Sequence, residues 1–168
     1  INSYTYNEDN LILSGAKVNF WRAPVDNDYG AKTPELYAEW KDAARKDVTV
    51  KYTVEAMESG AYRVNFETTM LKGDGKFLQS YEVYSDGSIS VNNQLKVVGD
   101  ITEANRKPHS NLYKFGNRFV LSPELTKVTW YGRGPFESAT DRKYASHLGI
   151  YDKTVSELLS LYSRPQDN

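Results

Sequence analysis

The sequence contains no cysteine and only two histidines, and both scarcities exclude kinds of chemistry. Without cysteine the chain can form neither a disulfide bond nor a thiolate metal site, although this does not fix its cellular compartment. His109 and His147 are far apart in sequence and have no carboxylate at a recognised ligand spacing. We therefore expect neither a zinc site nor a histidine-based nucleophile triad.

Long apolar runs and an excess of one charge are missing as well. No apolar segment approaches the length of a membrane span, and the first residues do not resemble a signal peptide. The chain has 21 basic and 22 acidic residues, which gives a net charge of −1. Because the basic residues are also dispersed, we expect no nucleic-acid partner and no membrane partner.

The sequence is instead rich in aromatic residues and in alternating patterns. Its 168 residues leave room for one domain with a sizeable core. Aromatic residues make up 13% of the chain, and 13 of its residues are tyrosines. Such a composition favours β-strands and also suits stacking on the faces of sugars.

Apolar and polar residues alternate through the middle of the chain, from Val48 onward. The segments with this pattern are 48–56, 62–66, 77–83 and 89–97. The Asp86-Gly87 pair between two of them is a strong hairpin signal, because both central residues of such a turn need positive φ. We predict an antiparallel meander in which each strand has one buried and one wetter face.

Shorter strand candidates flank the meander, and one helix precedes it. The flanking candidates are 11–13, 115–121 and 128–131, whereas 99–111 is predicted to be a long loop. In the helix Thr33 is the N-cap and Pro34 the first helical residue, and the helix ends near residue 46. Leu36, Trp40 and either Ala43 or Ala44 recur at helical spacing and form its apolar face. Many strands with one short helix predict an all-β, antiparallel β-sandwich.

The segment Trp130–Lys143 combines aromatic residues, glycines, a proline and alternating charges. Residues 132–135 must turn, because glycine reaches positive φ and proline restricts its predecessor. If the residues that follow are helical, Glu137 and Asp141 share one face with Arg142 beside them. No glycine-lysine-serine or -threonine run follows, which excludes a phosphate-binding loop.

Two hypotheses stay open for this segment. The carboxylates could form a catalytic pair for glycosidic chemistry. Alternatively, Arg133 and Arg142 could hold nearby carboxylates and backbone carbonyls in a rigid corner. The local residues favour the corner.

A second unusual segment, Asn19–Asp28, leads into the polar stretch Asp26–Gly30, which we predict to be a loop. Asp26, Asp28 and the backbone at Gly30 could supply oxygen ligands for calcium. The spacing is not that of an EF-hand, since the glycine comes one place early and no glutamate closes the loop. The favoured alternative is a turn or an ion-pair loop with Arg22.

Three blocks resemble the C-terminal β-sandwich domain, or small chain, of β-galactosidases of glycoside hydrolase family two. In chain order they are Asn19–Asp28, then Trp130–Glu137 with Asp141-Arg142 after it, and finally Tyr162–Asn168. All three stand in the order that the family has. The chain departs from the family where Tyr113 and Lys114 replace a proline-arginine pair, and where Ser138-Ala139 replace asparagine-tyrosine.

The resemblance implies a galactose mutarotase-like supersandwich. It implies that residues 1–168 are one domain, a fragment truncated at its C-terminus and, in one alternative, at its N-terminus as well. It implies that the parent enzyme hydrolyses terminal β-galactosides with retention, using two glutamates in a separate barrel. Magnesium and sodium are implied for that barrel, and no cofactor or catalytic residue for this chain. We expect the chain alone to be inactive.

The resemblance further implies that this domain supports the barrel and shapes the rim of the sugar pocket. Its implied partners are the other domains of a homo-oligomeric parent and a galactoside, in a compartment that is cytoplasmic, periplasmic or secreted. The alternatives are an independent carbohydrate-binding module and a structural contact domain between domains or subunits. The candidate substrate-binding residues are Trp21, Arg22, Asp26, Asp28, Arg133, Phe136, Glu137, Asp141 and Arg142.

Overall fold

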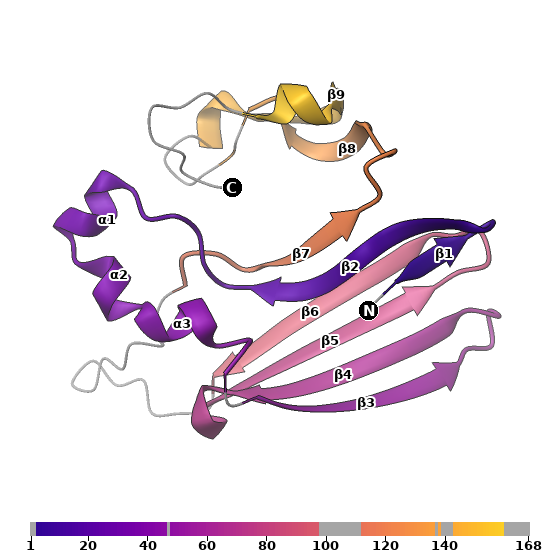
Figure 1. The fold of residues 1–168 in the computed structure, drawn as a ribbon, viewed down its shortest axis with the longest axis horizontal. Helices are drawn as coiled ribbons and strands as arrows, with labels where there is room; N and C mark the ends of the chain where they lie inside the picture. The colour runs from indigo at the N-terminus through magenta and orange to yellow at the C-terminus, as the bar shows by residue number, and fades with distance from the viewer. Residues whose placement is uncertain (1–2, 47, 98–111, 137, 139–142, 160–168) are drawn as a thin grey trace. The chain divides into compact units, whose positions relative to one another are not determined.

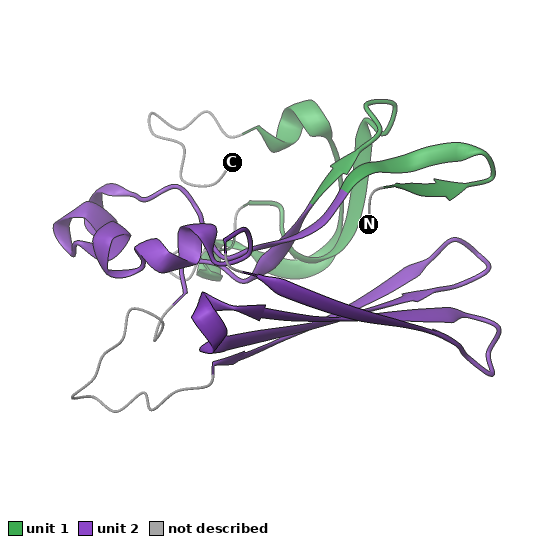
Figure 2. Ribbon diagram, turned by 60° about the horizontal axis from the view of Figure 1, so that its bottom comes forward, with its two compact units in different colours: residues 1–14, 119–165 green, residues 15–118, 166–168 purple. Residues whose placement is uncertain are grey.

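The computed structural model describes residues 3–46, 48–97, 112–136, 138 and 143–159. It is mostly β, with several antiparallel sheets and a few short helices (Figure 1). The chain divides into two compact units, coloured separately in Figure 2, which comprise residues 1–14 with 119–165 and residues 15–118 with 166–168. The single sandwich domain stays a prediction.

The predicted meander forms the largest sheet, in the order β3-β4-β5-β6 (Figure 1). Its strands are β3 (Thr49–Ala56), β4 (Tyr62–Met70), β5 (Gly75–Val83) and β6 (Ile89–Val97). All three pairings are antiparallel and proceed without a register shift from one end of each ladder to the other. The alternating pattern therefore identified both the strands and their neighbours.

The prediction that each strand has one buried face is wrong for β3. Its residues are exposed along the whole strand, including Val50, Tyr52 and Val54 at 53%, 70% and 58%. On β5 the same face of the sheet is buried, with Phe77 at 3% and Tyr81 at 2% exposure. The reason is positional, because the core cluster contains Phe77 of β5 and has Leu95 and Val97 of β6 packed against it, but involves no residue of β3, at the opposite edge of the sheet.

The predicted hairpin at Asp86-Gly87 joins β5 to β6, but its turn differs from the expected one. Among the described residues of this turn only Gly87 has positive φ, at 83°. Asp86 instead accepts hydrogen bonds at its carboxylate from the amide and the hydroxyl of Ser88, at 2.9 and 2.7 Å. The side chain thus stabilises a turn with a single left-handed glycine, as longer hairpin loops do.

The remaining strands form smaller sheets. One has the order β1-β2-β7, built from β1 (Tyr4–Tyr6), β2 (Asp9–Asn19) and β7 (Gly116–Leu121). The other pairs β8 (Lys127–Gly134) with β9 (His147–Thr154). The prediction that residues 132–135 turn is wrong for 132–134, which continue the strand, and neither Gly132 nor Gly134 has positive φ. Among the described residues, short 3-10 turns are η1 (Leu71–Gly73), η3 (Lys143–Ala145) and η4 (Val155–Leu158).

The predicted helix is broken into short pieces, and the predicted loop before it is helical. The pieces are α1 (Asp26–Gly30), α2 (Thr33–Leu36) and α3 (Ala38–Asp42). Thr33 lies inside α2 rather than at its N-cap, which is Lys32 in the left-handed region at φ 55°. Tyr37, at φ −110° and ψ 15°, separates α2 from α3. The hydroxyl of Thr33 serves a tertiary contact instead of a cap.

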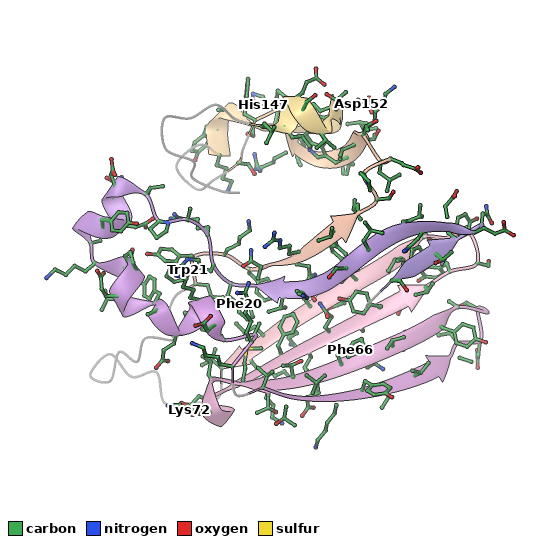
Figure 3. The ribbon with its side chains drawn as sticks, in the orientation of Figure 1. Phe20, Trp21, Phe66, Lys72, His147 and Asp152 are labelled. Atoms are coloured by element: carbon green, nitrogen blue, oxygen red, sulfur yellow. The ribbon has the colours of Figure 1, made fainter. Side chains whose placement is uncertain are left out.

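The core of the larger unit confirms the predicted apolar face of the helical segment at Trp40 and Ala43 but not at Leu36, which is 54% exposed. Trp40 and Ala43 are buried with Phe20, Met70 and Phe77 in one cluster. The ring of Phe20 packs edge-on against Trp40 at 5.1 Å and against Phe77 at 5.9 Å between centroids. This cluster fixes the end of β2, where Phe20 and Trp21 are labelled in Figure 3, against α3 and the four-stranded sheet.

Two predictions cannot be compared with the fold. The loop at 99–111 and the third family block at 162–168 lie outside the described residues. No described helix has both the length and the apolar character needed to cross a membrane.

Candidate functional site

The Asn19–Asp28 segment is organised by an ion pair between Arg22 and Asp28. The guanidinium donates two hydrogen bonds to the carboxylate, at 2.7 and 3.2 Å. The side chains are 26% and 13% exposed, so the pair is partly withdrawn from water. Arg22 also donates to the backbone carbonyl of Ala23 at 2.9 Å. The geometry confirms the ion-pair alternative for this segment, since two donors in a fixed plane match one carboxylate.

Asp28 receives further donors, so both of its oxygens are engaged. The amide of Val25 donates to one oxygen at 2.8 Å, which stabilises the first turn of α1. The hydroxyl of Thr33 lies 3.3 Å from the other oxygen. Thr33 in turn accepts a hydrogen bond from the hydroxyl of Tyr113. A chain of hydrogen bonds therefore joins α1, α2 and the segment before β7.

Aromatic rings enclose this polar chain, which we call the Arg22 cluster and define as Trp21, Arg22, Asp28, Thr33, Tyr37 and Tyr113. The ring of Tyr113 packs edge-on against Trp21 at 4.8 Å and against Tyr37 at 5.4 Å. The Arg22 guanidinium lies 4.8 Å from the centroid of Tyr113, a cation-π distance. Lys41 approaches the Trp21 ring at 5.9 Å. These rings limit the directions in which the polar groups can move.

The environment keeps Asp28 ionised. Burial alone would raise the pKa of its carboxyl, but the hydrogen bonds from Arg22 and Val25 and the charge of Arg22 outweigh burial and lower the pKa below its usual value. Tyr113 responds in the opposite direction, since burial raises the pKa of its phenol. Asp28 therefore has the character of a fixed anion rather than of a proton donor.

The described residues do not fit a metal centre. Among them, no group of three or more histidine, aspartate or glutamate side chains gathers closely enough to hold an ion. Asp28, one of the two carboxylates in the calcium hypothesis, is engaged by nitrogen and hydroxyl donors. The magnesium and sodium that the resemblance implies for the barrel stay predictions about the parent enzyme.

The Trp130–Lys143 segment contains a corner built on Arg133. The guanidinium donates to the backbone carbonyl of Ser146 at 3.0 Å and lies 3.4 Å from that of Lys143. Ser146 is 1% exposed, and its hydroxyl donates to the carbonyl of Phe136 at 3.1 Å. These contacts confirm the rigid-corner hypothesis for Arg133 and its carbonyl partners.

Close packing of a tyrosine against glycine shapes the same corner. The Tyr151 ring packs at a tilt of 32° against Trp130, with 5.4 Å between centroids, and covers Gly134, where an added Cβ would meet it at 2.6 Å. Gly134 is followed by Pro135 through a cis peptide bond. Tyr151 also donates its hydroxyl to the carbonyl of His147 at 2.9 Å. In Figure 3 His147 and Asp152 are labelled on β9, the strand that carries Tyr151.

The structure brings some predicted site residues together and leaves others apart. Trp21, Arg22 and Asp28 belong to the Arg22 cluster, and Asp26 begins α1 nearby in sequence. Arg133 and Phe136 are linked through Ser146. Glu137, Asp141 and Arg142 lie outside the described residues. Substrate binding by any of the predicted residues stays a prediction.

Sequence reasoning missed Thr33, Tyr37 and Tyr113 of the Arg22 cluster, and Ser146 and Tyr151 of the corner. Thr33 was assigned to a helix cap, and Tyr113 was noted only as a departure from the family. The contact between them joins residues that are 80 positions apart, which no local pattern reveals. Ser146 belongs to no sequence motif, and only the structure shows that it is buried in the corner.

Comparison with known proteins gives these two arginine-centred segments a family context. The sequence profile described as "Beta galactosidase small chain" matches residues 1–168. A beta-galactosidase of Priestia megaterium (strain DSM 319 / IMG 1521) is 30% identical over 98% of this chain and 15% of its own length. One from Lactobacillus delbrueckii subsp. bulgaricus is 33% identical over 88% of the chain and 14% of its own length.

A third relative, the beta-galactosidase of Clostridium acetobutylicum, is 31% identical over 90% of this chain and 16% of its own length. The chain thus spans about one sixth of the curated relatives that it matches. It corresponds to part of a beta-galactosidase, a domain of a larger glycoside hydrolase. The match along the whole chain means that this protein belongs to the beta-galactosidase small chain family.

Proposed function

We propose that this chain is a non-catalytic β-sandwich domain of a β-galactosidase, and that it supports the catalytic barrel and the rim of its sugar pocket. The main observation in support is that the chain matches the small-chain family from end to end yet spans only 15% of the Priestia megaterium relative. In this proposal the complete protein hydrolyses terminal β-galactosides. The two carboxylates that do so belong to the part that the chain does not span.

The Arg22 cluster supports a structural role for the first family block. Its carboxylate is fully engaged by donors, and its lowered pKa opposes the protonated state that a general acid needs. The cluster holds the backbone of α1 and α2 in one arrangement. A loop fixed in this way could present its outer residues to a neighbouring domain without taking part in chemistry itself.

Uncovered apolar residues support a contact with other parts of the parent enzyme. In the four-stranded sheet, Val50, Tyr52 and Val54 of β3 continue the face that is buried on β5. Such a half-covered face is what a β-sandwich shows when part of its second layer belongs elsewhere. The supersandwich assignment, the single domain over 1–168 and the homo-oligomeric parent rest on the family resemblance and are parts of this proposal.

An independent carbohydrate-binding module is the second candidate. Exposed aromatic residues favour it, since Tyr29, Tyr131 and Phe136 are 59%, 78% and 65% exposed. Aromatic rings on a protein surface can stack on the apolar face of a pyranose. Tryptophan fluorescence recorded while galactose or lactose is added tests this candidate, because a binding platform near Trp21 or Trp130 would change the emission.

The decisive experiment compares the isolated chain with the complete polypeptide in hydrolysis of a chromogenic β-galactoside. The proposal predicts turnover by the complete polypeptide, and none above background by the isolated chain. It also predicts that deletion of this segment from the complete polypeptide abolishes turnover, and that magnesium removal lowers it without affecting the folding of this segment. Hydrolysis by the isolated chain at an enzyme-like rate would contradict the proposal.

A further inference from the structure

The four-stranded sheet has a second, polar face that the supporting role does not use. The register places Thr53, Asn65, Ser80 and Asn92 opposite one another on neighbouring strands. Side chains directly opposite in antiparallel strands stand on the same face. One row of four uncharged hydroxyl and amide side chains therefore runs straight across the sheet, from β3 to β6.

A groove lies over this row. It has a volume of about 520 Å³, which is within the range of about 300–1,000 Å³ typical of small-ligand sites. The next row of the same face also lines it, with Lys51, Glu67, Leu78 and Gln94 paired in register. Leu78 is the one apolar side chain of these two rows and lies in the interior of the sheet, on β5. Tyr52, Phe66 and Gln79, which pair in register between these two rows, also line the groove. The groove thus combines amide and hydroxyl groups with apolar surface.

Most charge on this face is paired. Glu67 accepts a hydrogen bond from Lys76 at 3.4 Å, and Arg63 donates to Glu82 at 2.7 Å in a row beside the groove. Lys51, on the edge strand, is the lining cation for which the described residues provide no ion pair. Apart from Lys51 and Glu67, which is paired with Lys76, the polar groups that line the groove are neutral, and such a lining does not suit a strongly charged ligand.

The neutral side chains have hydrogen-bonding capacity to spare. Asn65 donates to Thr53 at 3.3 Å and to Glu55 at 3.1 Å. Within the part of the chain that the structure describes, the side chains of Ser80, Asn92 and Gln94 bond to no other protein group. An amide side chain offers both donors and acceptors from one plane, and a hydroxyl does the same from one atom.

We propose that this groove binds a neutral saccharide, at a site separate from the Arg22 cluster and from the Arg133 corner. Sugar hydroxyls donate and accept hydrogen bonds at once, which matches a row of amides and hydroxyls better than a row of ions. Neighbouring strands lie about 4.8 Å apart, a spacing that lets adjacent side chains address hydroxyls on one sugar ring. Leu78 supplies the apolar contact that the C–H face of a ring needs.

The structure distinguishes this groove from the neighbouring apolar face. The side chains of the two rows point away from the buried cluster of Phe77 and Met70, because side chains alternate along each strand. A sugar in the groove would therefore leave the core unchanged. This binding does not depend on the proposed supporting role, since it requires only the four-stranded sheet.

The test is an amide proton-nitrogen correlation spectrum of the isotope-labelled 168-residue chain, recorded while lactose is added. The side-chain amide signals of Asn65, Asn92 and Gln94 should shift progressively and saturate together. Replacing two exposed amides in the variant Asn92→Ala/Gln94→Ala should weaken binding about ten-fold, because two hydrogen bonds of about 0.7 kcal/mol each are lost.

A matched variant on the same strand and the same face keeps the result specific. Ser90→Ala/Lys96→Ala lies in the rows that do not line the groove and should leave the lactose affinity unchanged. Backbone signals of every variant report whether the sheet is intact. The proposal is overturned if the amide signals stay fixed at the solubility limit of lactose, if shifts occur only near Trp21 or Phe136, or if both variants weaken binding equally.

Discussion

The two family blocks that the structure describes each centre on an arginine, but the arginines have different partners. Arg22 donates to the carboxylate of Asp28, whose other donors come from Val25 and Thr33. Arg133 donates to backbone carbonyls, with Ser146 at 3.0 Å as its nearer partner. One arrangement joins two opposite charges, and the other joins a charge to the peptide backbone.

This difference determines how each segment responds to change. An ion pair whose members are 26% and 13% exposed leaves a poorly solvated charge when one member is lost. A backbone carbonyl that loses its arginine remains neutral and can turn to water where water reaches it. We therefore expect the Arg22 cluster to be sensitive to charge and pH, and the Arg133 corner to be sensitive to shape.

The largest effect is expected from Arg22→Ala. The variant leaves the Asp28 carboxylate without its cation, and the free energy of unfolding should fall by about 3 kcal/mol. Chemical denaturation of the chain measures this change in the free energy of unfolding. Arg63→Ala is the matched control, because its pair with Glu82 is more exposed at 36% and 23%, and its loss should be much smaller. Equal losses in both variants would contradict the central place of the Arg22 cluster.

Gly134→Ala should produce the next largest effect and tests the shape of the corner. The new methyl group would meet the Tyr151 ring at 2.6 Å, and moving that ring off Trp130 should cost about 2 kcal/mol. Gly132→Ala is the control on the same strand, since its nearest neighbour would lie at 3.6 Å. Hydrogen exchange of the β8 and β9 amides should accelerate only in Gly134→Ala, and a stable Gly134→Ala would disprove the tight corner.

A smaller effect is expected from Tyr113→Phe. The substitution removes the hydroxyl that donates to Thr33 but keeps the ring between Trp21 and Tyr37, so the loss should be about 1 kcal/mol. Tyr29→Phe is a suitable control, because Tyr29 is 59% exposed. Thermal unfolding of both variants gives the comparison, and an unchanged Tyr113→Phe would mean that the hydroxyl contact contributes nothing.

The mildest perturbation is acid. The pKa of Asp28 is lowered in the folded chain, against an unfolded value of about 3.9. Its contribution to stability is therefore fully present above that unfolded value and is lost as pH falls through the lower folded value. As the pH falls below 4, the free energy of unfolding should decrease more steeply in the unsubstituted 168-residue chain than in Asp28→Asn. Arg133→Gln should retain the steep loss, because its carbonyl partners do not titrate.

Much of the strand architecture could be predicted from sequence, because alternation and burial coincide in the central sheet. The register of β4, β5 and β6 follows directly from residues such as Val64, Phe77 and Val91. The exposed β3 could not be foreseen, since its apolar residues alternate just as regularly as those of the covered strands. A pattern identifies which face of a strand is apolar, but not whether anything covers it.

The helical segment and the site show the limit of local patterns in another way. Thr33 and Pro34 do begin a helix, α2, but Lys32 is its N-cap, the helix ends at Leu36, and the Thr33 hydroxyl contacts Asp28 and Tyr113. Local propensity was outweighed by contacts across the fold. The Arg22–Asp28 pair was predictable because both residues stand in one short segment, whereas Tyr113 and Ser146 reach their partners from distant parts of the sequence.

The most direct test of the account is the Michaelis constant of the complete polypeptide for a β-galactoside, measured together with its melting temperature in Arg22→Ala and Asp28→Asn. If the Arg22 cluster supports the domain, both variants should melt earlier, while the molecules that remain folded keep their Michaelis constant and turnover number. A Michaelis constant raised about ten-fold at an unchanged melting temperature would place Arg22 and Asp28 in contact with sugar and contradict the account.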